Sequence, residues 1–274
     1  GWIKVTQIGG LDNRILPGQM VTVHGQRDLP GILQMIPDRL KEKSKAGNPP
    51  KITDLFVEVG LTVREVTRTV KIGDLVSFAQ APLEMTGNTV AGHSLDNRAS
   101  VAALTLCLEE LRRVNLTWDV WAVATIQEEE TLLGARTSAF NLHPDIAVAI
   151  DVTFGKGPGS NDHHTFPLGK GPTIGVGANI HPSLAVRFKK TAEAMDLPYA
   201  VETMPKNSGT DAIAMQVTAE GIPCAVISIP LRYMHTPLEM VSLKDIQRAA
   251  RLVARFITQL EPDSMEKIFA ESRV

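Results

Sequence analysis

The hydrophobic positions of this chain are distributed differently before and after about residue 87. In the first part, short apolar runs alternate with turn residues such as Gly-Gly, Pro-Gly, Pro-Pro and Gly-Asp. We expect strands at residues 3–8, 20–24, 55–59 and 75–78, which together predict a small β-rich domain over residues 1–87. The stretch 41–51 carries four lysines and two prolines and is expected to be a mobile, solvated loop.

From about residue 88 the pattern changes to helices alternating with wholly apolar strands. Helical periodicity covers residues 96–114, 182–195, 208–220 and a final helix from Ser242, where Asp245 has the spacing of a capping-box partner. Apolar runs at 118–126, 146–150 and 225–229 predict buried strands. This alternation is typical of an α/β domain whose mostly parallel sheet is flanked by helices. We therefore expect a second domain over residues 88–274.

Composition narrows the function classes. The chain has 274 residues with a formal net charge of −2, which gives no support to a nucleic-acid or membrane-surface role. No apolar stretch approaches the roughly 20 residues needed to span a bilayer. Cys107 and Cys224 lie inside apolar runs and are expected to be buried thiols, so the expected location is cytoplasmic.

Three consecutive glutamates, Glu128, Glu129 and Glu130, directly follow the apolar run 118–126. At roughly 4 Å, each like-charge pair costs about 1 kcal/mol in water and about 4 kcal/mol at an effective dielectric constant near 20. A chain retains such a cluster most readily where a cation, a proton or a substrate amine interacts with it. The glutamates are therefore the first candidate for chemistry.

Polar residues from other segments are expected at the same place. Asp151 directly follows the strand pattern 146–150, His235 lies just beyond 225–229, and Asp96 begins a helical pattern. Ligands in α/β sheets bind at the carboxyl ends of the strands, so these side chains should converge. Carboxylates and imidazole without paired cysteines favour Zn²⁺, Co²⁺ or Mn²⁺ in a catalytic site, with an unligated carboxylate as general base.

Each of these residues also has an ordinary alternative explanation. Asp96 could be a simple N-cap, Asp151 could start a turn, the glutamates could be a solvated charge run and His235 could be a surface or core histidine. Only their combination favours a metal site. The chain has no Gly-x-Ser-x-Gly elbow and no phosphate-binding loop.

The remaining histidines join this site less clearly. His163 and His164 lie in a Gly-rich segment and are expected in an exposed loop, with contact to a metal ligand or to the substrate as the alternatives. The others are expected to be structural: His24, His93, His143 and His181.

Five segments occur in the same order in the TET-type dinuclear zinc aminopeptidases, which the chain resembles over nearly its whole length. They are Leu95-Asp96-Asn97-Arg98-Ala99, Gln127-Glu128-Glu129, Ala149-Ile150-Asp151-Val152-Thr153, Gly209-Thr210-Asp211-Ala212 and Arg232-Tyr233-Met234-His235-Thr236-Pro237. This family includes glutamyl and deblocking aminopeptidases and members labelled cellulase or endoglucanase M. The resemblance implies a zinc-exopeptidase α/β domain, interrupted by a small β-barrel-like dimerisation domain over residues 1–87. It also implies peptide substrates and dimers that build a tetrahedral dodecamer.

The resemblance also implies the roles of individual residues. Asp96 resembles the carboxylate that bridges two divalent ions (zinc or cobalt), Glu129 and His235 resemble ligands of one ion, and Asp151 a ligand of the other. Glu128 resembles the general base, which deprotonates a bridging water. Residues expected to contact the substrate are Glu130, Gly209, Thr210, Asp211 and Arg232.

Two features depart from the family pattern. The family's remaining ligand is a histidine in a His-x-Asp segment upstream of the equivalent of Gly1, so the ion held by Asp151 is expected to be weakly bound. Glu130 and Thr131 also stand where the family usually has Val-Gly. These departures leave a non-catalytic, self-assembling homologue as an alternative to a metal-dependent aminopeptidase, and a two-carboxylate endoglucanase as a further one.

Overall fold

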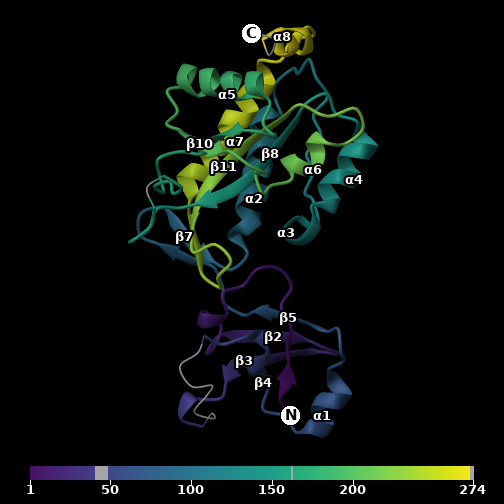
Figure 1. The fold of residues 1–274 in the computed structure, drawn as a ribbon, viewed down its shortest axis with the longest axis vertical. Coiled ribbons are helices and arrows are strands. Elements are labelled where there is room, and N and C mark those ends of the chain that lie inside the picture. Colours follow the sequence, from purple (N-terminus) through teal and green to yellow (C-terminus); the bar gives the residue numbers. More distant parts are fainter. Residues whose placement is uncertain (41–48, 162, 272–274) are drawn as a thin grey trace. The chain divides into compact units, whose positions relative to one another are not determined.

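The computed structural model describes residues 1–40, 49–161 and 163–271, and it divides into two compact units (Figure 1). The first unit comprises residues 1–83 with the short segments 92–94 and 235–239, and the second comprises 84–91, 95–234 and 240–274. The dimerisation domain predicted at 1–87 and the catalytic domain predicted at 88–274 stay predictions. The expected loop over 41–51 lies outside the described residues except for 49–51.

The first unit is built on an antiparallel half-barrel sheet of five strands in the order β1-β4-β3-β2-β5. Alternate side chains of its strands, including Val23 and Val57, point into one core that also contains Leu16. One helix, α1, starts with a capping box between Thr62 and Glu65. The elements are β1 (Ile3–Lys4), β2 (Met20–His24), β3 (Asp28–Met35), β4 (Leu55–Glu58), α1 (Val63–Thr69) and β5 (Leu75–Phe78).

The strands expected at 20–24, 55–59 and 75–78 are confirmed within one residue, but β3 was not predicted. Pro30 and Gly31 interrupt its apolar run, and both residues normally argue against a strand interior. Gly31 fits there because a Cβ at this position would lie 2.7 Å from Cγ1 of Val57 on the neighbouring strand. The run expected at 3–8 is shortened to β1.

The second unit contains a mixed sheet in the order β10-β9-β11-β12-β7-β6, with β8 paired to β11. Pairs β8/β11 and β9/β10 are parallel, whereas β11 runs antiparallel to β9 and β12. The prediction of a mostly parallel sheet is therefore wrong. A strand covered on both faces is apolar whether its neighbour runs parallel or antiparallel, so the apolar pattern did not reveal the direction of the strands. The strands are β6 (Leu83–Met85), β7 (Thr89–Gly92), β8 (Ala147–Phe154), β9 (Thr173–Gly177), β10 (Ala200–Met204), β11 (Cys224–Arg232) and β12 (Glu239–Ser242).

Helices cover both faces of this sheet. Ala225, Ile227 and Ile229 of β11 belong to a core shared with α2, α5 and α7, where Phe188 and Phe256 stack with ring centroids 4.1 Å apart. Cys224 and Val226 belong to a second core with α4 and α6. The helices are α2 (Leu95–Leu111), α3 (Glu128–Thr131), α4 (Leu133–Leu142), α5 (Pro182–Ala194), α6 (Ala212–Gln216), α7 (Leu243–Thr258) and α8 (Ser264–Glu271).

The strand predicted at residues 118–126 is wrong. None of the strands in the described part of the chain falls between β7 and β8, and Trp121 and Ile126 are each 69% exposed. An apolar run becomes a strand only when a neighbour accepts its backbone hydrogen bonds. No such neighbour stands beside this segment among the described strands.

The capping-box role predicted for Asp245 is also wrong. Helix α7 has Ser242 as its N-cap residue without a side-chain cap bond. The fully buried Asp245 instead accepts hydrogen bonds from the backbone amides of Gly169 (2.5 Å) and Gly171 (2.8 Å). It therefore ties a distant turn to the start of α7.

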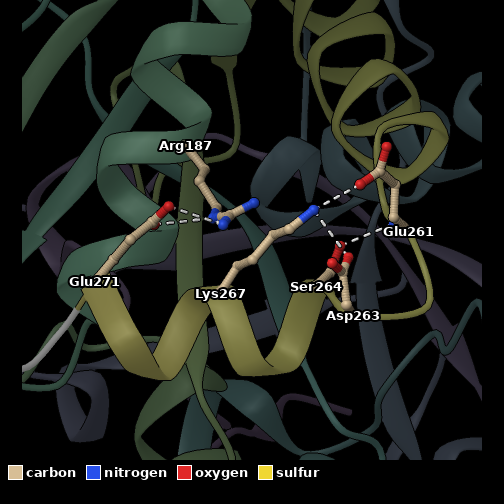
Figure 2. A network of polar contacts seen from close by, with 6 residues as sticks. All are labelled: Arg187, Glu261, Asp263, Ser264, Lys267 and Glu271. Carbon is tan, nitrogen blue, oxygen red and sulfur yellow. Dashed lines mark hydrogen bonds and ion pairs between the residues drawn. The ribbon is translucent and has the colours of Figure 1, made fainter.

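Figure 2 shows how α8 is attached at the end of the described chain. Arg187 of α5 pairs with Glu271 at 2.9 Å, and Lys267 pairs with Glu261 and Asp263 at 2.7 and 2.9 Å. These pairs are partly exposed, so solvent screens them and each adds little to the stability of the fold.

The remaining sequence expectations concern membranes and cysteines. Within the described residues, no helix has the length and apolar character to cross a membrane. Both cysteines are buried and unbridged, and burial raises the pKa of the Cys107 thiol to about 11 and that of Cys224 to about 12. The prediction of buried thiols is confirmed.

Candidate metal centre

Four acidic segments of the second unit meet at one site. Asp96 lies at the entry to α2, Glu128 and Glu129 lie in the single turn α3, Asp151 is in β8, and Asp211 precedes α6. Gln127, just before α3, has a left-handed backbone with φ 62°. Such a conformation is uncommon outside glycine and occurs where surrounding structure requires it.

Asp151 is the most buried carboxylate of this group, with 7% of its surface exposed. One of its oxygens accepts hydrogen bonds from the Asn97 side chain and from the Val152 backbone amide, both at 2.8 Å. Burial nevertheless raises its pKa well above the ordinary value, and the negative charges of Glu128 and Asp96 add to this effect. A cation beside Asp151 would offset that cost.

Glu128 is half-buried among other acids. Burial, followed by the charges of Glu129, Asp211 and Asp96, raises the pKa of Glu128 from 4.5 to about 7. The site thus holds more negative charge than these surroundings favour, which is the electrostatic condition expected of a cation site.

Asp211 adds a further carboxylate to the site. One of its oxygens accepts a hydrogen bond from Thr125 Oγ1 at 2.6 Å. Its Oδ1 is buried without a hydrogen-bond partner in the described residues, and burial raises the pKa of this carboxyl. An unpartnered buried acceptor favours binding of a donor from outside the chain.

Asp96, Glu129 and His235 each offer one ligand atom, and these three atoms all lie within 4.8 Å of one another. His235 lies in the loop between β11 and β12, two strands that pair at Leu231 and Val241. Two carboxylates and an imidazole form a donor set that fits Zn²⁺ or Co²⁺. Three of the four residues predicted as metal ligands thus come together as one group, and Asp151 is not a member of it.

The conformation of His235 is constrained by its loop. Its backbone is left-handed with φ 61°, and its amide donates to the carboxylate of Glu239 at 2.9 Å. A Cβ added at Gly10 would lie only 2.8 Å from His235 Nδ1, so the absence of a side chain at Gly10 leaves room for the ring.

Most of the residues predicted to bind substrate do not line the cavity beside the carboxylates. Arg232 donates from Nε to the carbonyl of Lys156 at 2.5 Å, Gly209 has φ +70°, Thr210 is buried and Glu130 is exposed. Only Asp211 among them lines the cavity beside the carboxylates, which has a volume of about 440 Å³. His163 and His164 are exposed, as expected.

Two residues that orient the carboxylates were not predicted from sequence. Asn97 holds Asp151, and Thr125 holds Asp211. Asn97 directly follows Asp96, and this position next to a predicted ligand could have identified it as part of the site. Thr125 lies inside an apolar run, where nothing in the sequence indicates a role in the site.

Comparison with known proteins identifies relatives over almost the whole chain. The family described as M42 glutamyl aminopeptidase matches residues 1–252. The lysyl aminopeptidase of Pyrococcus furiosus is 32% identical over 268 residues, which cover 96% of this chain and 76% of that protein.

Solved structures give the same result for the fold. A TET aminopeptidase from the archaeon Thaumarchaeota archaeon SCGC AB-539-E09 superimposes with a TM-score of 0.92 at 26% identity, covering 98% of this chain and 77% of that one. The TET1 peptidase of Pyrococcus horikoshii, which can assemble into a tetrahedron or a large octahedral shell, has a TM-score of 0.80 at 27% identity, with 93% and 76% covered.

Proposed function

The chain belongs to the M42 glutamyl aminopeptidase family and is therefore a metallo-aminopeptidase, a hydrolase, and on this premise we propose that it removes N-terminal residues from peptides with Glu128 as general base. The proximity of Asp96, Glu129 and His235 carries the proposal, because their ligand atoms lie within 4.8 Å of one another. Asp96, Glu129 and His235 would hold one divalent ion, and Asp96 together with Asp151 would hold a second. Bound divalent ions would polarise the scissile carbonyl and lower the pKa of a water molecule.

Glu128 suits a base that acts near neutral pH. Its carboxylate would accept the proton of the attacking water and pass it to the departing amine of the peptide. A pKa of about 7 lets the same group hold and release a proton under physiological conditions. Nearby cations would favour its ionised form and so lower this pKa.

The substrate's free amine provides the exopeptidase selectivity in this proposal. The buried, unpartnered Oδ1 of Asp211 would accept a hydrogen bond from the ammonium group, with Glu130 adding negative charge nearby. Gly209 and Thr210 would shape the loop that presents Asp211, and Arg232 would position the segment at Lys156 against the peptide.

The primary test is the variant Glu128→Gln. It should abolish turnover of aminoacyl-p-nitroanilides while the metal content, measured by elemental analysis, remains that of the wild type. The exposed Glu220→Gln variant is the matched control and should retain activity. Full activity of Glu128→Gln would contradict the assignment of the base.

Elemental analysis also separates this proposal from the non-catalytic alternative. We expect two divalent ions per chain and activity that a chelator removes, whereas a non-catalytic scaffold would bind one ion or none and hydrolyse no peptide. Hydrolysis of glucan that survives the chelator would instead favour the endoglucanase alternative.

Assembly is a separate part of the proposal. TET homologues form closed shells, and we propose that this chain forms dimers that assemble into a tetrahedral dodecamer in the cytoplasm. Light scattering coupled to size-exclusion chromatography should give a mass near twelve chains, and a stable monomer would refute this part alone.

A further inference from the structure

A histidine on the outer face of the first unit's sheet contacts an acid on one side and a serine on the other. His24 lies in β2, Asp28 in β3 and Ser77 in β5. His24 Nδ1 lies 2.9 Å from Asp28 Oδ1, and His24 Nε2 lies 2.8 Å from Ser77 Oγ. Both distances are those of hydrogen bonds, so the three side chains form one continuous row. We call these three residues the surface triad.

The strand register brings the three side chains together. His24 stands directly opposite Asp28 on β3. On the other side, Ser77 stands opposite Thr22, two residues before His24 on β2. Across an antiparallel pair, side chains directly opposite each other and those displaced by two residues are within reach of each other. The alternate residues of β2 point into the core, so the surface triad lies on the exposed face of the sheet.

The order of these contacts gives each group a chemical role. An ionised carboxylate has no hydrogen to donate, so Nδ1 of a neutral His24 carries the proton in the bond to Asp28. Nε2 is then unprotonated and accepts the hydroxyl hydrogen of Ser77. A hydroxyl whose proton can pass to an oriented imidazole is an activated nucleophile, which is how the Ser-His-Asp triads of hydrolases work.

One backbone amide beside the serine is available for a developing oxyanion. Among the strands of the described chain, β5 pairs with β2 alone. The Ala79 amide donates to the Met20 carbonyl of β2 at 3.0 Å, so the amide of the preceding residue, Phe78, points to the unpaired side of β5. Each such donor is worth about 10²- to 10³-fold in rate, and a single one supplies only part of what a hydrolase usually provides.

The surroundings of the surface triad limit what it can attack. Ser77 is exposed, and 40% of the His24 side chain is accessible to solvent. Leu75 and Met20, which lie on the same face, are exposed apolar side chains. An open surface of this kind can hold a short acyl chain but does not enclose a large one. The surface triad therefore suits small esters with a good leaving group and not amides, whose amine leaves poorly.

We propose that Ser77, His24 and Asp28 form a second hydrolytic site, an esterase for small aryl esters. Ser77 Oγ bonds to the acyl carbon while His24 Nε2 takes the hydroxyl proton. The bond from the acyl carbon to the aryl oxygen then breaks as that proton passes to the departing oxygen. A water molecule attacks the acyl-serine in the same way, which releases the carboxylic acid and restores Ser77. No step uses a metal ion, so the site is independent of the function proposed above.

Hydrolysis of p-nitrophenyl acetate by chelator-treated protein separates this site from the metal centre. We expect nitrophenol release faster than in buffer, and an acetyl group on Ser77 after a rapid acid quench, located by mass spectrometry of the peptides. Ser77→Ala and His24→Gln should each lower the chelator-resistant rate at least tenfold. The matched control Thr22→Ala removes the hydroxyl opposite Ser77 and should leave the rate unchanged.

Asp28→Asn tests the orienting role of the acid. An asparagine amide can donate to His24 Nδ1 and so favour the tautomer that is protonated at Nε2, which leaves no acceptor for the hydroxyl of Ser77. The rate should fall at least tenfold although the side chain keeps its shape. Circular dichroism spectra identical to that of the wild type would show that the variants are folded.

Three results would overturn the proposal. They are nitrophenol release by the wild type that is no faster than in buffer, acetylation of lysines with none on Ser77, and a chelator-resistant rate that survives Ser77→Ala. The acetyl group is sought on the wild-type protein, so this measurement does not depend on the folding of any variant. Each of the three results would mean that the surface triad only joins neighbouring strands.

Discussion

The acidity of Glu128 predicts a pH-dependent stability that its replacement removes. The pKa of Glu128 is about 7 in the folded protein and 4.5 ordinarily. Because the folded-state pKa is raised, burial of Glu128 costs the folded protein nothing below pH 4.5. Stability is lost as the pH rises from 4.5 to about 7, and above that the loss is complete. Glu128→Gln should therefore be nearly neutral at pH 4.5 and stabilising at pH 8 in metal-free protein.

The magnitude follows from the size of this interval. At about 1.4 kcal/mol per pH unit, the interval from 4.5 to about 7 corresponds to roughly 3 kcal/mol at full burial. Glu128 is partly exposed, and solvent screening reduces the expected gain to about 1–2 kcal/mol. Added zinc should cancel the gain, since a cation favours the ionised glutamate over glutamine.

Urea unfolding provides the measurement. In a Trp2→Phe background, fluorescence reports on Trp118 and Trp121, which both lie in the second unit. The free energy of unfolding of the protein that retains Glu128 is compared with that of the Glu128→Gln variant at pH 4.5 and 8, with chelator and with zinc. A difference that does not change with pH would refute the electrostatic reasoning.

Three other predictions concern positions away from the base. Gly10→Ala should lower the affinity for zinc at least tenfold in an equilibrium titration, because the added methyl group would displace the His235 ring, whereas Gly157→Ala, in open space, should leave it unchanged. Phe188→Ala should destabilise the second unit by about 3–5 kcal/mol in urea unfolding, because it leaves a cavity at a fully buried position. Asp245→Asn should cost about 1–3 kcal/mol in the same assay, because one of its two amide-accepting oxygens becomes a donor.

Local patterns were sufficient where a segment's structure depends on its own residues. Strands β2 and β5 and helix α5 were predicted almost to the residue, since turn residues or a leading proline mark their ends. The helix predicted at residues 208–220 was too long, because only Ala212–Gln216 is helical and the flanking residues form turns. Whether a segment pairs with another strand depends on distant parts of the chain, which a local pattern does not contain. For this reason β3 was missed and residues 118–126 were wrongly predicted as a strand.

The sequence by itself indicated that acids and a histidine would gather at one edge of an α/β sheet, because they stand at or after apolar runs, although the run before the glutamates is not a strand. The tertiary structure alone decided which of them meet. It groups Asp96, Glu129 and His235, leaves Asp151 held by Asn97, and brings Asp211 close enough to raise the pKa of Glu128. Such proximity depends on how distant segments pack, because electrostatic coupling falls with distance in space and not with separation along the chain.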